Sequence, residues 1–222
     1  MNGIFTNEQL AAMKDEFNSL LRSTNRPGVE NLITWLEQNT DFYVAPASQG
    51  YHGCFPGGLI SHSLNVYHAA VKLREVYKEL ALPEKKVDGI TDDSLIISTL
   101  LHDLCKANIY KETKKWVKDE NEKWHQYLTY TIEDPIPWGH GAKSCMLIQY
   151  HMFLKVDEAC AILHHMCSLD PWMTNPGNTY AYKPLMDSLD RYSLVLIVAQ
   201  ADMIASFQME EKIDQKVVNR IS

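Results

Sequence analysis

The chain has 222 residues, of which 45% are hydrophobic and 22% are charged, as in ordinary globular proteins. This composition excludes a disordered or fibrous protein, and the length suffices for a domain with a hydrophobic core. The formal net charge of −7 argues against a broad polynucleotide-binding face, which needs clustered Lys and Arg, but it allows a small basic pocket.

Helical periodicity dominates the sequence. Thr6 and Gln9 form a capping box at the start of the first predicted helix, and Thr91 offers an N-cap for a buried helix. A loop rich in Gly, Pro and Ser is expected over 44–58, and a lid-type loop over 168–184. The helices are predicted at about residues 7–22, 29–39, 59–81, 93–106, 140–152, 156–167 and 188–208.

Residues 109–132 depart from this helical pattern. Aromatic and apolar residues are interleaved there with Lys, Glu, Thr and Gln, around a polar turn at 119–122. This pattern predicts a small β-hairpin inserted in a helical protein. Its aromatic side chains Trp116, Trp124 and Tyr127 are candidates for a dimer contact or a substrate wall, and we favour the interpretation that they form one packed face of the hairpin.

The domain organisation is predicted to be simple, because no internal repeat and no domain boundary is visible. We expect an all-α bundle with the inserted hairpin as a single domain over 1–222, with N-terminal helices in 1–43 packed on a core over 57–208.

The five cysteines are odd in number and irregularly spaced, which favours reduced thiols in a cytoplasmic protein. The N-terminal region has charged residues instead of a signal-peptide apolar stretch. The apolar run from Leu194 to Ala199 is far too short to cross a membrane. We therefore expect no membrane partner.

Histidine is the unusual residue type, with nine copies, and it is the commonest metal ligand in proteins. Asp103 and Asp202 lie in apolar helical patterns, where an ionised carboxylate is costly unless a cation or hydrogen bonds compensate it. A single histidine in such a pattern is more often a hydrogen-bonded core residue. Several histidines and aspartates in this order, on separate predicted helices, favour a metal centre. In chain order the residues are His62, His102, Asp103, His140, His164, His165 and Asp202.

This series resembles the HD-domain superfamily of metal-dependent phosphohydrolases. The opening motif and the His-Asp-Leu-x-Lys segment most resemble the HD domain of bacterial 3′–5′ exoribonucleases and related HD hydrolases. The ligand order also resembles that of HD-GYP cyclic-dinucleotide phosphodiesterases, whose Gly-Tyr-Pro signature is absent here. The motifs span about 57–203 and are Gly-Gly-Leu-Ile-Ser-His62-Ser-Leu, Leu-Leu-His102-Asp103-Leu-Cys-Lys106, Gly-His140-Gly-Ala-Lys143-Ser, His164-His165-Met and Ala-Asp202-Met.

The resemblance implies one or two divalent metal ions (Mn, Fe, Ni, Zn or Mg) in an HD fold. His140 and either His164 or His165 would bind the second ion and share Asp103 with the first. His165 is favoured because Cys167, two residues further on, fits better where relatives have Gly. The first ion would be bound by the four residues that define the superfamily, His62, His102, Asp103 and Asp202.

The implied chemistry is phosphoester hydrolysis. Two ions roughly 3.5–4 Å apart can hold phosphoryl oxygens and lower the pKa of a bound water. Asp103, Lys106 and Lys143 are the candidate catalytic residues, and the two lysines are also candidate phosphate clamps. The alternative for each lysine is a solvated surface charge. Further candidates for substrate contact, against simple loop packing, are Tyr51, Trp172 and Tyr180.

The predicted function is hydrolysis of a phosphomonoester or phosphodiester of a nucleotide or short oligonucleotide by metal-activated water. The expected partner is a small phosphorylated substrate, with short single-stranded nucleic acid and a homo-oligomer left open. Two alternatives remain. One is a di-iron oxygenase of HD type, because imidazole and carboxylate also suit iron. The other is a non-catalytic nucleotide-binding module.

Overall fold

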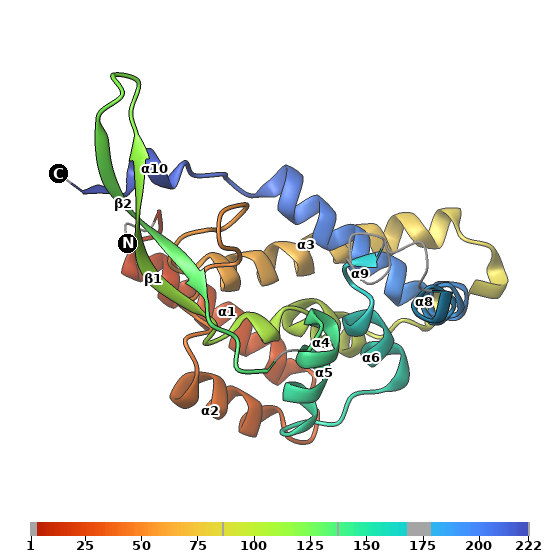
Figure 1. Cartoon of the computed structure of the whole chain (residues 1–222). Coiled ribbons are helices and arrows are strands. Elements are labelled where there is room, and N and C mark those ends of the chain that lie inside the picture. Colours follow the sequence, from red (N-terminus) through yellow and green to blue (C-terminus); the bar gives the residue numbers. More distant parts are fainter. Residues whose placement is uncertain (1–3, 86, 137, 168–178, 222) are drawn as a thin grey trace.

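Helices form most of the structure, and a small antiparallel sheet projects from one end of the helical body (Figure 1). The computed structural model describes residues 4–85, 87–136, 138–167 and 179–221. The predicted fold class is confirmed as a mostly helical chain with a hairpin. The helices are α1 (Asn7–Ser23), α2 (Val29–Asn39), α3 (Gly58–Leu80), α4 (Asp92–Leu101), α5 (His140–Gln149), α6 (Val156–Leu163), α8 (Thr179–Arg191), α9 (Ser193–Ile204) and α10 (Gln215–Val218).

The helices α3, α4 and α9 form the centre of the bundle, where α3 packs against both α4 and α9. The residues of α4 from Ser94 to Leu101 are all buried, because this helix is apolar almost all round. One core cluster joins the N-terminal helices to α3 and α4, and a second joins α3 to α9. The predicted capping box of α1 is present, with both Thr6–Gln9 hydrogen bonds formed.

The predicted hairpin is confirmed. Its strands β1 (Tyr110–Lys118) and β2 (Trp124–Ile132) pair antiparallel along their whole length. The Asp119 carboxylate accepts hydrogen bonds from the backbone N–H groups of Asn121 and Lys123, which closes the polar turn. A third strand, β3 (Arg220–Ile221), pairs with β2 and was not expected from the sequence.

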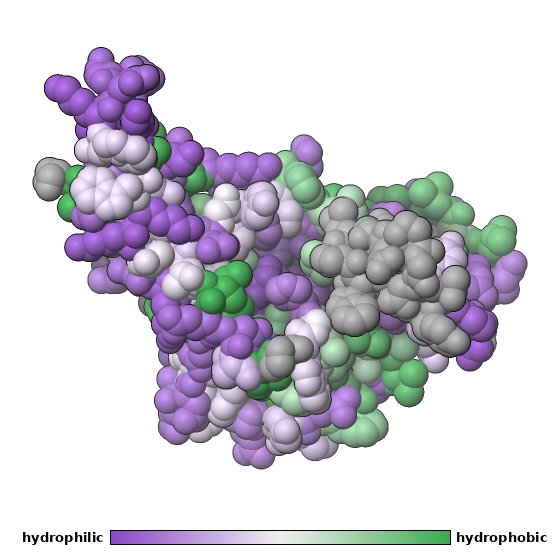
Figure 2. All heavy atoms as spheres, in the orientation of Figure 1, coloured by the Kyte–Doolittle hydropathy of each residue, from purple (hydrophilic) through white to green (hydrophobic). Residues whose placement is uncertain are grey.

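The interpretation of the hairpin aromatics as one packed face is wrong. Trp116 and Trp124 are each 61% exposed. The register pairs Trp116 with Gln126 and Lys118 with Trp124, so the two tryptophans share the face opposite Tyr127. Hydrophilic side chains dominate the visible surface of the projecting hairpin (Figure 2).

Four predicted helices differ from their expected lengths: those predicted over 140–152 and 156–167 end at Gln149 and Leu163, and two others end early or break. The helix predicted over 93–106 ends at Leu101, because Asp103 leaves the helical region at φ −103° and ψ 21° and a 3₁₀ turn (Leu104–Lys106) follows. The helix predicted over 188–208 is broken at Tyr192, whose extended backbone separates α8 from α9.

The segment predicted as a loop over 168–184 is partly helical, since α8 already begins at Thr179 and contains Pro184. The remaining positions, 168–178, lie outside the described residues. Within the described part of the chain, no individual helix has the length and apolarity of a membrane span. The segments Tyr182–Arg191 and Ser193–Met209 reach the length and apolarity of a span only when taken together, and the chain bends by 106° between them.

Candidate metal centre

Three histidines and two aspartates from separate elements meet in the interior of the bundle. His62 lies on α3, His102 at the end of α4, His165 just after α6 and Asp202 on α9. The ring atom His62 Nε2 lies 3.2 Å from both His102 Nε2 and Asp202 Oδ1. The three histidines are at most 1% exposed, so the contacts among these groups are shielded from solvent.

Asp103 lies between these histidines. Its Oδ2 atom lies 3.3 Å from His102 Nε2 and 3.5 Å from His62 Nε2. Its Oδ1 atom lies 3.5 Å from His165 Nε2. The two oxygens of a single carboxylate therefore face different histidines, which is the arrangement needed to bridge two cations.

Backbone carbonyls orient two of the rings. His102 Nδ1 lies 2.7 Å from the carbonyl oxygen of Thr99, and His165 Nδ1 lies 2.7 Å from that of Ile162. Because a carbonyl oxygen only accepts, each Nδ1 donates, and in the neutral ring Nε2 keeps its lone pair. Such partners fix the ring and the tautomer of metal-binding histidines.

The donor set fits a divalent cation. Among the described residues, Asp103 Oδ1 and His165 Nε2 are buried without a hydrogen-bond partner, and each such group is costly in free energy. The Nε2 atoms of His62 and His102 also face each other, so a proton or a cation is needed between them. Imidazole nitrogens and carboxylate oxygens suit Zn, Mn, Fe and Ni. His62, His102 and Asp103 offer ligand atoms within 4.8 Å of one another, as do His102, His165 and Asp202.

The electrostatics keep the carboxylates ionised. Burial alone would raise the pKa of Asp103, but the Lys106 ammonium, 2.6 Å away, and the imidazoles hold it well below the usual range. Asp202 likewise has a lowered pKa despite its burial, chiefly because it contacts His62. Burial lowers the pKa of His62, yet its carboxylate neighbours raise it well above the usual value. An ionised carboxylate is the form that binds a metal.

Glu210 and His52 adjoin this centre, and Glu210 was missed in the sequence analysis. Glu210 Oε1 lies 2.7 Å from His62 Nδ1, and its Oε2 lies 2.7 Å from His52 Nδ1. Burial raises the pKa of Glu210, but the two imidazoles outweigh it and lower the value to about 2. A π-helical turn (Ala205–Met209) lies between Asp202 and Glu210. Regular helical spacing therefore gives no signal for this contact.

The remaining metal candidates lie around this centre. His140 Nδ1 lies 3.5 Å from Cys105 Sγ, and the two residues form a further possible metal-binding group with Asp103. His165, rather than His164, has its ring among the central groups.

The predicted phosphate clamps differ in their surroundings. Lys106 lines a cavity of about 190 Å³ that also reaches Asp202, His52 and Tyr51. Lys143 is buried and forms an ion pair with Asp134, with 2.6 Å between Nζ and Oδ1. Its role as a clamp stays a prediction.

The sequence predicts substrate contacts for two further aromatic residues. Trp172 and the side chain of Tyr180 lie outside the described residues.

Glycine allows the close approach of helices around the centre. A Cβ atom on Gly141 would overlap the carbonyl oxygen of Leu163, where α5 crosses the end of α6. Gly141→Ala should therefore push His140 away from the centre and lower the free energy of unfolding by about 1–3 kcal/mol. Urea denaturation measures this change. Gly139→Ala is the matched control, because a Cβ atom there meets open space. Equal destabilisation by both variants would contradict the steric argument.

Comparisons with known proteins give one partial relative. No protein-family model and no solved structure matches the chain. Over 91 residues the chain is 30% identical to the dihydroneopterin 2′,3′-cyclic phosphate phosphodiesterase of Methanocaldococcus jannaschii. The match covers 40% of this chain and 34% of the relative, so the chain spans about a third of that protein.

Proposed function

We propose that the chain is a metal-dependent phosphohydrolase of the HD superfamily that cleaves a phosphoester of a nucleotide or short oligonucleotide. The observation that carries this proposal is the pair of buried, unpartnered ligand atoms, Asp103 Oδ1 and His165 Nε2, that face each other at 3.5 Å. The partial similarity to a phosphodiesterase supports the reaction class.

Membership of the HD superfamily is supported by the way the chain brings the residues of the motifs together. The short distances among His62, His102, Asp103 and Asp202 agree with a first ion bound by these four residues. Cys167 adopts φ +48°, a left-handed conformation that favours glycine, at the position where HD relatives have Gly. This backbone conformation supports His165 as the ligand in its motif.

In this proposal His62, His102, Asp103 and Asp202 would hold one divalent ion, and His140 and His165 with Asp103 would hold a second. When bound, such ions act as Lewis acids on phosphoryl oxygens and lower the pKa of water to supply a nucleophile.

Other groups of the chain orient the metal-binding histidine rings and neutralise the charge of the phosphate. Glu210 holds the His62 ring through Nδ1, and the backbone carbonyls of Thr99 and Ile162 hold the other rings. Lys106 contributes the positive charge for the non-bridging oxygens of a phosphate, since it lines the cavity that reaches Asp202.

The proposal is tested by metal content and turnover in the same preparation. Protein purified without a chelator or a His-tag should contain one to two divalent ions per chain by elemental analysis. It should release p-nitrophenol from bis(p-nitrophenyl) phosphate, and EDTA should stop the reaction until a divalent ion is restored.

Two outcomes would overturn the proposal. Iron-loaded protein that consumes O₂ with an organic substrate, and does not hydrolyse the phosphodiester, would indicate the oxygenase. Protein that gains thermal stability with nucleotides but shows no turnover with Mn²⁺, Fe²⁺, Ni²⁺ or Zn²⁺ would indicate a binding module.

A further inference from the structure

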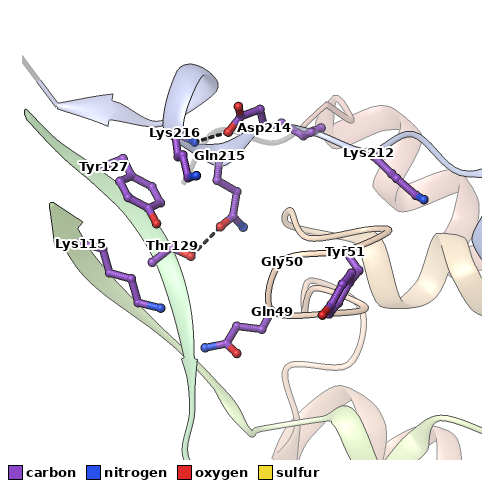
Figure 3. A pocket seen from close by; sticks show the side chains of 11 residues that line it. Gln49, Gly50, Tyr51, Lys115, Tyr127, Thr129, Lys212, Asp214, Gln215 and Lys216 are labelled. Atoms are coloured by element: carbon purple, nitrogen blue, oxygen red, sulfur yellow. Dashed lines mark hydrogen bonds between the residues drawn. The ribbon is translucent and has the colours of Figure 1, made fainter. Parts of the chain in front are cut away.

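A second, larger cavity neighbours the small cavity that reaches Lys106 and Asp202. It measures about 670 Å³ and lies between the loop around Tyr51, the hairpin and the C-terminal segment around Gln215 (Figure 3). This volume is in the range of about 300–1,000 Å³ that is typical of small-molecule sites.

The wall of this cavity is built by buried polar contacts. Thr129 Oγ1 donates a hydrogen bond to Gln215 Oε1, and Gln215 Nε2 donates one to the Cys54 carbonyl oxygen at 2.9 Å. Both Thr129 and Gln215 are buried. These contacts fasten the C-terminal segment to the hairpin on one side and to the loop before α3 on the other.

The cavity is positively charged although the chain is acidic. Three lysines line it, Lys115 from β1 and Lys212 and Lys216 from the C-terminal segment. Asp214 is the one carboxylate among the described lining residues, and it accepts a hydrogen bond from the Lys216 backbone N–H at 2.9 Å. Local positive charge on a chain of net charge −7 favours an anionic ligand here.

The lysine-lined cavity lies next to the smaller cavity that reaches the centre. Tyr51 and Lys212 line both this cavity and the smaller one that reaches Lys106 and Asp202. The Lys212 ammonium lies 5.1 Å from the centre of the Phe207 ring, which also lines the smaller cavity. Tyr51 is 77% exposed at the junction, so its ring is available for stacking.

We propose that this lysine-lined cavity binds a second phosphate of the substrate, so that the substrate is a short single-stranded oligonucleotide with its scissile phosphate at the His/Asp centre. The inference rests on the proposed function and extends it. Lysines that follow the phosphate backbone, together with an aromatic ring that stacks on a base, are the usual means of binding single strands.

The test measures binding without turnover. Fluorescence anisotropy of a labelled hexathymidylate with the full-length protein in EDTA gives Kd over a series of salt concentrations. Lys115→Glu and Lys216→Glu should each raise Kd by about tenfold or more. Each should also reduce the slope of log Kd against log salt by about 0.7, because one lysine no longer neutralises a phosphate of the single strand.

Lys114→Glu is the matched control. Lys114 is the neighbour of Lys115 on β1 and is exposed on the opposite face of the hairpin. Its replacement by Glu changes the net charge by the same amount as Lys115→Glu. It should change Kd by less than about twofold, because exposed distant charges are screened by salt. Equal weakening by Lys114→Glu and Lys115→Glu would overturn the assignment of the cavity.

Two further comparisons identify the ligand. Tyr51→Ala should weaken hexathymidylate binding and leave competition by inorganic tripolyphosphate unchanged. Thymidine monophosphate that competes as well as hexathymidylate would overturn the second phosphate site. If binding follows these expectations but bis(p-nitrophenyl) phosphate is not hydrolysed, the proposed function fails and the cavity assignment stands. If bis(p-nitrophenyl) phosphate is hydrolysed but the binding expectations fail, only the cavity assignment is overturned.

Discussion

Asp103→Asn should lower kcat/KM for bis(p-nitrophenyl) phosphate by about a thousandfold or more, since metal-ion catalysis contributes several kcal/mol to the transition state. The substitution removes the charge that faces His62, His102 and His165 and keeps the shape of the side chain. Elemental analysis should show loss of metal from the same protein. Circular dichroism should show the helical content of the wild type.

Lys106→Ala separates catalysis from metal binding. Lys106 forms an ion pair with Asp103 at 2.6 Å and lines the cavity beside the centre. If it contacts the substrate phosphate, the variant should lose roughly a hundredfold in rate and keep its metal. Loss of metal instead would mean that Lys106 holds Asp103 in place.

The outcome that contradicts the first prediction is full activity of Asp103→Asn, which would show that Asp103 takes no part in the reaction.

Arg26→Ala should lower the free energy of unfolding by about 3–5 kcal/mol, because it leaves a fully buried carboxylate without its main cation. The Arg26 guanidinium contacts both oxygens of Glu158, at 2.6 and 3.2 Å. Glu158 is 0% exposed, and Ser94 and the Lys155 backbone N–H also donate hydrogen bonds to it. These contacts tie the start of α6 to α4. Urea denaturation measures the change.

Arg22→Ala is the control for this prediction. Arg22 forms a similar pair with Glu30, but both side chains are at least half exposed. Its removal should cost less than about 1 kcal/mol, since solvent screens an exposed pair. Equal destabilisation in the two variants would show that burial does not set the strength of the Arg26–Glu158 pair.

Local patterns in the sequence are sufficient to predict most of the elements. The Thr6–Gln9 capping box, the apolar periodicity of the helices around it and the alternation in 110–132 act over a few residues each. Hydrogen bonds and side-chain entropy within one or two turns decide these features. The His and Asp residues in the apolar helices could also be singled out from the sequence. Burying such a side chain is costly in free energy unless a cation or hydrogen bonds compensate it.

Only the tertiary structure decided which side chains meet. Glu210 contacts His62 across 148 residues, and Gln215 contacts Thr129 across 86 residues. The π-helical turn before Glu210 and the break at Tyr192 interrupt the single helix that the sequence pattern predicts over 188–208. The two-residue strand β3 is too short to give a periodic signal, and its pairing with β2 brings the C-terminal lysines beside the hairpin. Long-range packing thus determined the environment of the centre and the lysine-lined cavity, because no short window of sequence contains both partners of these contacts.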